Sequence, residues 1–417
     1  MNYERLTLPN GVRILTEQVP GVRSASLGIW VGTGSRHEKA GENGAAHFIE
    51  HMLFKGTARR TAAQLAEEMD AVGGQVNAFT TKECTCFYAR VLDTHLPRAA
   101  DILCDMFFHS RFDDADVETE RGVILEEIGM YEDTPEDLVS ERLAAAVYKG
   151  TPLARPILGR ASTLAAMTGE SLAQWQREHY RPGAMVAALA GSFTQAQADR
   201  LRDCLAGLEP GPVPRSRPAA YQPAVTARRK ATEQNHLILA FPAFSYLDDR
   251  RARLMLFNAL LGGGCSSRLF QEVREKRGLC YSVYSYVADH EDTGLLGIYT
   301  AVSREQEGAA LDTIREVVCR LADEGPAQEE LDRVREQAKA NLLMGAESVQ
   351  SRMSQLGASA LLYGRVREEA EILELYDAVT REKLRELAGT LFRMERASLS
   401  AVGRVRTVQD YAHWLGR

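Results

Sequence analysis

The sequence predicts an α+β fold made of two homologous domains, each a mainly antiparallel sheet packed with helices. Segments of alternating apolar and polar residues, which indicate strands, occur beside segments with apolar residues at helical spacing. Residues 209–226 interrupt this pattern with five prolines and no amphipathic period, which is typical of a linker. The order of the expected elements before this linker is repeated after it. We therefore expect domains at residues 1–208 and 227–417.

The length, net charge and hydropathy of the chain indicate its number of domains and argue against some classes of partner. A chain of 417 residues exceeds one comfortable hydrophobic core, which favours two domains. The net charge of −7 and the lack of a dense Lys/Arg block argue against a nucleic-acid partner. No apolar run approaches the length that spans a bilayer, so no membrane partner is expected.

The N-terminus and the cysteines indicate a cytoplasmic protein. Residues 1–5 have neither the apolar region of a signal peptide nor the Arg/Ser-rich pattern of a transit peptide. The seven cysteines are dispersed and form no C-x-x-C pair, which suits a reducing compartment. Cys84 and Cys86 lie in a strand-like run, where we expect both thiols to pack in the core.

The first elements are predicted strands. Residues 6–8 and 12–15 flank a Pro-Asn-Gly turn signal and should form a hairpin. The alternation continues over residues 24–31. A polar loop at residues 32–43 then leads to a short helix.

This helix, at residues 44–55, carries the most informative motif of the chain. Asn43 is its expected N-cap, and Gly56 ends it. His47 and His51 are four residues apart and lie on one face, which makes half of a tetrahedral zinc site. Glu50 reaches the same face, where a carboxylate can accept a proton from water; the order is that of H-x-x-E-H inverzincins. The simpler alternative is a pair of hydrogen-bonded core histidines.

The next segments alternate helices and strands. A capping box from Thr61 to Gln64 opens a helix that ends near residue 72, before two glycines. Residues 75–81 and 84–92 read as a β-hairpin, and residues 96–109 as an amphipathic helix.

An acidic helix is expected at residues 114–130. Glu120 and Glu127 are seven residues apart and project from nearly one face, so this pair could face a metal ion. Glu126 is rotated by about 100° from Glu127, and spacing within the helix does not choose between these two acids.

The later elements support the internal repeat. A helix near residues 171–179 and a strand at residues 185–190 close the first half at Gly191. The second half shows a strand at 236–241, helices at 251–261 and 266–276, a strand at 280–289, and a final strand that ends at Gly403. The helix at 251–261 aligns with the histidine-bearing helix but has no His or Glu. The second copy should therefore keep the fold without the metal.

Several motifs together resemble one peptidase family. They are His47-x-x-Glu50-His51, Gly73-Gly74-x-x-Asn77-Ala78, the acidic helix, and Arg274 with Tyr281 after the run at residues 262–269. The sequence is similar to the pitrilysin, insulin-degrading and mitochondrial processing peptidase family, and most similar to its short two-domain bacterial members. This resemblance implies the mitochondrial processing peptidase-like metallohydrolase fold.

The resemblance implies a zinc-dependent endopeptidase acting on unfolded peptides or short polypeptides. One Zn²⁺ per chain would be held by His47, His51 and Glu127, since the family spacing selects Glu127 over Glu126. Glu50 would be the general base for a zinc-activated water, and Glu120 would act from the outer shell of the site.

The resemblance also implies a substrate site and a partner. Asn77, Ala78 and Phe79 match an edge strand that pairs with the substrate backbone. Arg274 and Tyr281 match a pair that donates hydrogen bonds to the substrate carbonyl. This chain carries both the zinc-binding residues and the Arg/Tyr pair, so it resembles the homodimeric members of the family. The alternative is a non-catalytic structural or partner subunit of a processing-peptidase-like assembly.

Overall fold

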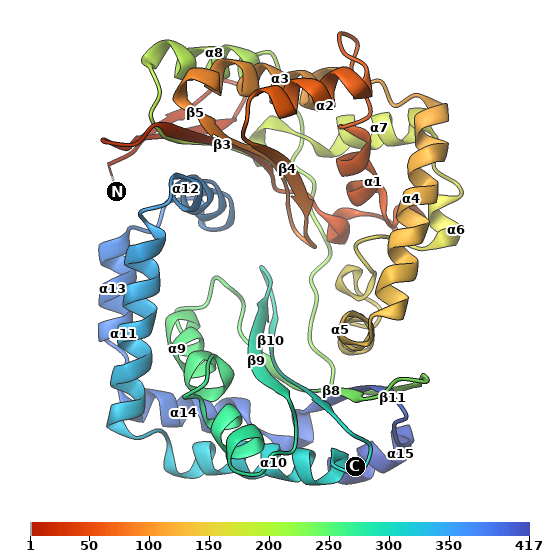
Figure 1. Cartoon of the computed structure of the whole chain (residues 1–417), viewed down its shortest axis with the longest axis vertical. Coiled ribbons are helices and arrows are strands. Elements are labelled where there is room, and N and C mark those ends of the chain that lie inside the picture. The colour runs from red at the N-terminus through yellow and green to blue at the C-terminus, as the bar shows by residue number, and fades with distance from the viewer. Residues whose placement is uncertain (1) are drawn as a thin grey trace. The chain divides into compact units, whose positions relative to one another are not determined.

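The chain forms two compact units, each built on one β-sheet. The structure is a computed structural model that describes residues 2–417. The first unit comprises residues up to 128 together with 155–217 and 343–368, and the second comprises 129–154, 218–342 and 369–417. Each sheet is packed with helices (Figure 1), so the α+β prediction is confirmed.

The units do not follow the continuous division predicted at residues 209–226. Helix α5 (Pro135–Val147) lies in the first half of the sequence but packs on strands of the second sheet. Helix α12 (Val349–Tyr363) lies in the second half but packs on strands of the first sheet. Each compact unit therefore contains one helical segment from the other half of the sequence. The reason is that each sheet has a face that the helices of its own half do not cover.

The first unit holds a six-stranded sheet in the order β1-β2-β6-β3-β5-β4. Its strands are β1 (Glu4–Thr7), β2 (Arg13–Gln18), β3 (Ser24–Val31), β4 (Gln75–Thr80), β5 (Thr85–Leu92) and β6 (Met185–Gly191). All neighbouring pairs are antiparallel except β2 and β6, which are parallel. The predicted hairpins at residues 6–15 and 75–92 are both present.

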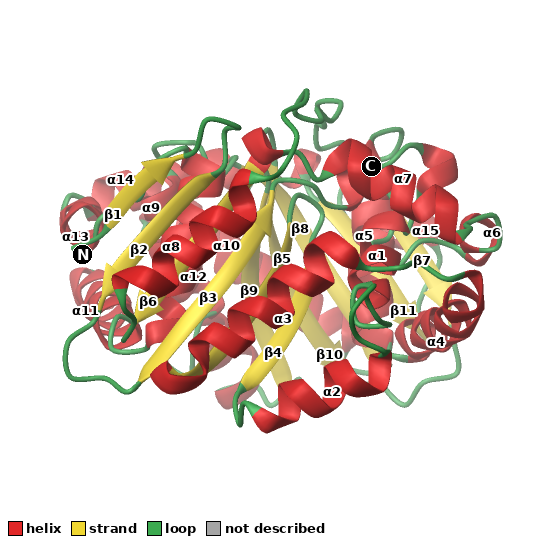
Figure 2. Ribbon diagram, turned by 90° about the horizontal axis from the view of Figure 1, so that it is seen from above, coloured by secondary structure: helices red, strands yellow, loops and turns green. Residues whose placement is uncertain are grey.

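Both faces of the central strands β3, β5 and β6 are largely buried. Side chains alternate along a strand, so Leu27 and Ile29 of β3 face one core while Trp30 faces another. The first core includes helices α1 (Ala45–Met52), α3 (Leu96–His109) and α8 (Gln195–Ala206). Figure 2 shows α3 and α8 lying across this face, and α12 covers the opposite face. This double cover explains why every residue of β6 is buried.

Helix α12 approaches the sheet closely at a glycine. A Cβ atom added to Gly357 would overlap the indole ring of Trp30, which is almost fully buried. Because Gly357 has no side chain, α12 can pack directly against the indole ring of Trp30.

We expect Gly357→Ala to lower the stability of the protein by about 1–3 kcal/mol, because the added methyl group overpacks this contact. Gly389→Ala is the matched control, since Gly389 is exposed on α14 (Arg381–Leu391) and a Cβ there meets no atom within 4 Å. That substitution should be neutral or stabilising by up to about 1 kcal/mol. Thermal unfolding of both variants measures the difference, and equal midpoints would contradict the proposed overpacking.

The second unit repeats the first topology. Its sheet has the order β7-β11-β8-β10-β9, with strands β7 (Val225–Arg229), β8 (Asn235–Ala243), β9 (Ser282–Asp289), β10 (Gly294–Val302) and β11 (Ser398–Gly403). Only β7 and β11 are parallel, as β2 and β6 are in the first sheet. Strands β6 and β11 both end at a glycine with positive φ, Gly191 and Gly403. These equivalences match the predicted repeat.

The remaining helices cover the two sheets or connect their strands. They are α2 (Ala62–Ala71), α4 (Asp114–Asp133), α6 (Ala161–Leu164), α7 (Gly169–His179), α9 (Arg251–Gly262), α10 (Glu307–Glu324), α11 (Gln328–Gly345), α13 (Glu369–Asp377) and α15 (Val408–Trp414). The helix expected at residues 266–276 is largely a π-helical segment, Phe270–Glu275. Among residues 2–417, no helix is both long enough and apolar enough to cross a bilayer.

Candidate metal centre

Helices α1 and α4 bring three potential metal ligands together in the first unit. The Nε2 atoms of His47 and His51 lie 3.6 Å and 3.7 Å from Oε2 of Glu127. One ligand atom from each residue lies within 4.8 Å of the others. Tetrahedral zinc with bonds of about 2.1 Å places neighbouring ligand atoms about 3.4 Å apart. The two imidazoles and one carboxylate therefore fit a zinc ion in both chemistry and spacing.

The start of α1 differs from the prediction. The helix begins after Gly44, whose φ of 103° places it in the left-handed region, so Asn43 is not the N-cap residue. The carboxylate of Glu38 instead accepts hydrogen bonds from the backbone N–H groups of Gly44 and Ala46 and from the amide of Asn43. A buried acid from the preceding loop thus satisfies two backbone N–H groups at the start of the helix.

The buried face of α1 holds the two histidines in place. Phe48, Ile49 and Met52 are fully or almost fully buried in the core of the first unit, which anchors the helix. His47 and His51 project together, and their ring centroids are 4.6 Å apart. The alternative of a hydrogen-bonded core pair does not suit His47, because its buried Nδ1 has no hydrogen-bond partner among residues 2–417.

The protonation state of His47 suits a metal ligand. Burial, with a smaller contribution from the nearby His51, lowers the pKa of His47 to about 4. The ring is therefore neutral at pH 7, and a neutral imidazole has a nitrogen lone pair that can bind a metal.

Glu120 contacts the second histidine. Its carboxylate is buried, and its Oε2 lies 3.0 Å from Nδ1 of His51. A proton on Nδ1 would donate to this carboxylate and leave Nε2 directed at Glu127. The other oxygen, Oε1, pairs with the ammonium group of Lys55. Lys55 is not among the predicted site residues; it lies beyond the end of α1, and no motif in its own segment indicates a contact with Glu120.

Glu50 has a hydrogen-bond partner that the sequence pattern does not predict. Its Oε2 accepts a hydrogen bond from the hydroxyl group of Thr80, the last residue of β4. Burial raises the pKa of Glu50, and the Thr80 hydrogen bond and His51 oppose this shift. Thr80 lies in a predicted strand, but its contact with α1 depends on how the two elements pack.

The structure distinguishes Glu127 from Glu126, between which helical spacing alone did not choose. Glu127 is partly buried and belongs to the His-His-Glu cluster, whereas Glu126 is exposed. The geometry therefore agrees with the choice implied by the family resemblance.

Sequence comparison assigns the chain to a known family. Residues 13–161 match the profile of Insulinase (Peptidase family M16), and residues 166–338 match the Peptidase M16 inactive domain. The chain is 43% identical to an uncharacterized zinc protease of Bacillus subtilis over 390 residues, covering 93% of this chain and 95% of the relative. The chain belongs to the M16 peptidase family. An uncharacterized zinc protease of Streptomyces coelicolor is 41% identical, with 97% of this chain and 90% of the relative covered.

Solved structures support the same fold for this M16 chain. A crystal structure of a peptidase M16 inactive domain from Pseudomonas fluorescens aligns with a TM-score of 0.90 at 22% identity, covering 98% of this chain and 99% of that one. A protease from Helicobacter pylori aligns with a TM-score of 0.88 at 18% identity, covering 96% and 99%. The predicted family and its short two-domain bacterial type are confirmed.

The predicted substrate strand of this M16 chain lies at a sheet edge. Strand β4 pairs only with β5 among the described strands, so its other edge has no strand partner. Asn77, Ala78 and Phe79 lie on this strand, and the side-chain oxygen of Asn77 accepts a hydrogen bond from the N–H group of Ala78. Phe79 is 41% exposed. An open edge of this kind can accept an extended peptide.

Arg274 and Tyr281 belong to the second unit and lie next to each other. The guanidinium carbon of Arg274 is 4.7 Å from the ring centroid of Tyr281 and 4.6 Å from that of Phe270. Tyr281 is 75% exposed, which leaves its hydroxyl group available to a ligand. Their action on a substrate at the metal centre stays a prediction.

Proposed function

We propose that this M16 chain is a zinc-dependent endopeptidase that hydrolyses unfolded peptides and short polypeptides. The observation that carries the proposal is the convergence of His47, His51 and Glu127 with a carboxylate, Glu50, on the same helix as the two histidines. This set contains the three ligands and the general base that a zinc hydrolase needs. The names of the relatives as zinc proteases support the same reaction class.

The proposed roles of the side chains follow from their contacts. A zinc ion bound by His47, His51 and Glu127 would polarise the scissile carbonyl and make water more acidic. Glu50 would accept the proton of the attacking water and pass it to the leaving amine. The hydroxyl group of Thr80 would hold one oxygen of Glu50 and leave the other free for this transfer.

The positioning groups would act through His51. Glu120 would keep the His51 ring in one orientation and one tautomer by accepting its Nδ1 proton. Lys55 would balance the negative charge of the buried Glu120, because its ammonium group binds the other carboxylate oxygen.

Substrate binding would use backbone pairing. An extended peptide added to the free edge of β4 at Asn77, Ala78 and Phe79 would be held by main-chain hydrogen bonds, which depend little on its side chains. Folded proteins rarely offer such a strand, so unfolded peptides are the expected substrates. Arg274 and Tyr281 would donate hydrogen bonds to the substrate carbonyl oxygen as it gains negative charge.

A peptide assay tests the proposal directly. A panel of quenched-fluorescent peptides is incubated with the purified protein, with and without a chelator, and the zinc content is measured in parallel. We expect cleavage that the chelator abolishes and that added zinc restores. Cleavage unaffected by complete removal of the metal would overturn the proposed mechanism, and a zinc-loaded protein that cleaves no peptide would overturn the peptidase assignment.

The alternative role, a non-catalytic structural or partner subunit, is not favoured. Subunits of that kind are expected to lack part of the metal set, whereas this chain has the complete set together with Glu50. The cytoplasmic location and the homodimer that the sequence predicted stay predictions.

A further inference from the structure

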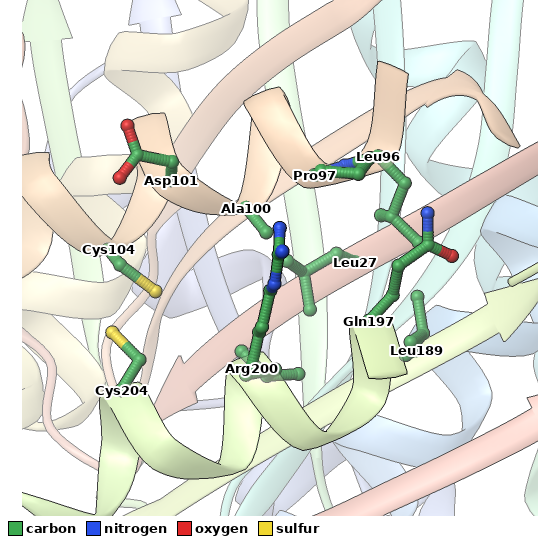
Figure 3. Close-up of a pocket in the computed structure, with 11 residues that line it drawn as sticks. Leu27, Leu96, Pro97, Ala100, Asp101, Cys104, Leu189, Gln197, Arg200 and Cys204 are labelled. Carbon is green, nitrogen blue, oxygen red and sulfur yellow. The ribbon is translucent and has the colours of Figure 1, made fainter. Parts of the chain in front are cut away.

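Two cysteine thiols face each other beside a pocket in the first unit. The pocket has a volume of about 200 Å³ and lies between α3 and α8, against Leu27 and Leu189 of the sheet. Its lining includes Cys104 from α3 and Cys204 from α8 but no member of the candidate metal centre. Figure 3 shows the two sulfur atoms pointing toward each other across the gap between the helices.

Residue spacing on α3 and α8 explains why the two thiols lie where these helices pack. Ala100 and Cys104 are four residues apart on α3, so both lie on the face that lines the pocket. Leu201, Cys204 and Leu205 share one face of α8, and both leucines are buried. The helices therefore pack by apolar faces that each carry one thiol.

The surroundings make the two thiols chemically different. The contact between the two thiols lowers the pKa of Cys204 and raises that of Cys104. Cys204 is also the less buried of the two. The guanidinium group of Arg59 favours the thiolate form at both residues, while Asp101 opposes it. Cys204 is therefore the better nucleophile of the pair.

We propose that Cys104 and Cys204 form a redox-active dithiol site, which small two-electron oxidants of the peroxide class convert into a disulfide that links α3 to α8. No C-x-x-C motif marks the site, because its members come from distant parts of the sequence. The pocket provides the path by which a small oxidant reaches the sulfur atoms.

The reaction balances with hydrogen peroxide as the oxidant. The Cys204 thiolate attacks one peroxide oxygen, the O–O bond breaks, and the leaving hydroxide takes a proton to become water. The resulting sulfenic acid is attacked by the sulfur of Cys104, which forms the S–S bond and releases a second water. Two thiols are oxidised to one disulfide while one peroxide is reduced to two waters, and a thiol reductant reverses the modification.

Peptide mapping of the full-length protein tests this site. The protein is titrated with hydrogen peroxide, its remaining thiols are alkylated after denaturation, and the products are mapped by mass spectrometry without reduction. We expect a peptide pair that joins Cys104 to Cys204 and has lost two hydrogen atoms, while the other five of the seven cysteines stay alkylated. The pair should form about tenfold or more faster than oxidation of the exposed Cys265 or Cys319.

Variants and thermal unfolding provide the controls. Cys204→Ser should abolish the linked peptide, whereas Cys265→Ser and Cys319→Ser should retain it. The oxidised wild-type protein should unfold at a higher temperature than the reduced protein, because the cross-link restricts the unfolded chain, and a thiol reductant should remove the increase. Separate alkylation of Cys104 and Cys204 after full oxidation of the exposed cysteines would overturn the proposal, and neither readout depends on peptidase activity.

Discussion

Replacement of Glu50 by glutamine is expected to lower kcat for peptide hydrolysis by about 10²–10⁴-fold while zinc stays bound. Glutamine has nearly the same shape and can still accept the hydrogen bond of Thr80, but it cannot accept the proton of the attacking water. The three proposed zinc ligands are untouched by this change. Steady-state kinetics with a quenched-fluorescent peptide and metal analysis of the same preparation measure both effects.

Glu67→Gln is the matched control for this experiment. Glu67 is an exposed residue of α2 outside the His-His-Glu cluster, so its substitution should leave kcat unchanged. A Glu50→Gln variant that keeps its zinc and cleaves peptides at the wild-type rate would refute the role of Glu50 as general base.

Replacement of Glu127 by glutamine is expected to remove both zinc and activity. The substitution deletes the one anionic ligand of the proposed set, which should weaken zinc binding by about 100-fold or more. The zinc content of the dialysed protein should fall from near one per chain toward zero, and cleavage should fall with it. Metal analysis and the peptide assay, repeated over a range of added zinc, give the affinity.

The neighbouring acid on α4 provides a strict comparison. Glu126→Gln removes the same charge from the same helix, but Glu126 is exposed and outside the cluster, so zinc content and activity should stay at wild-type levels. Equal zinc loss in both variants would show that the acidic helix acts through its overall charge. Zinc loss in Glu126→Gln alone would assign the third ligand to Glu126.

Local patterns in the sequence predicted much of the site. The spacing of His47, Glu50 and His51 is a property of one helix, and helical periodicity is sufficient to place these three side chains near one another. The strand of residues 75–80 and the capping box at Thr61 also follow from local signals, and both are present. The family resemblance added Glu127, which spacing within α4 had not separated from Glu126.

Local sequence patterns did not predict the contacts between separate elements. Asn43 has the chemistry of an N-cap, but Glu38 takes this role because the preceding loop folds its carboxylate against the helix N-terminus. Thr80 and Lys55 were not selected, since nothing in their own segments indicates that they contact Glu50 and Glu120.

The sequence alone determined the repeated α+β architecture, the histidine pair on one helix and the family of the chain, because these depend on periodicity and motif spacing along neighbouring residues. Only the tertiary structure decided that α5 and α12 each pack with the sheet of the other half, that Thr80 contacts Glu50, and that Cys104 faces Cys204. The physical reason is that these contacts join distant segments, and burial of apolar faces sets which segments meet.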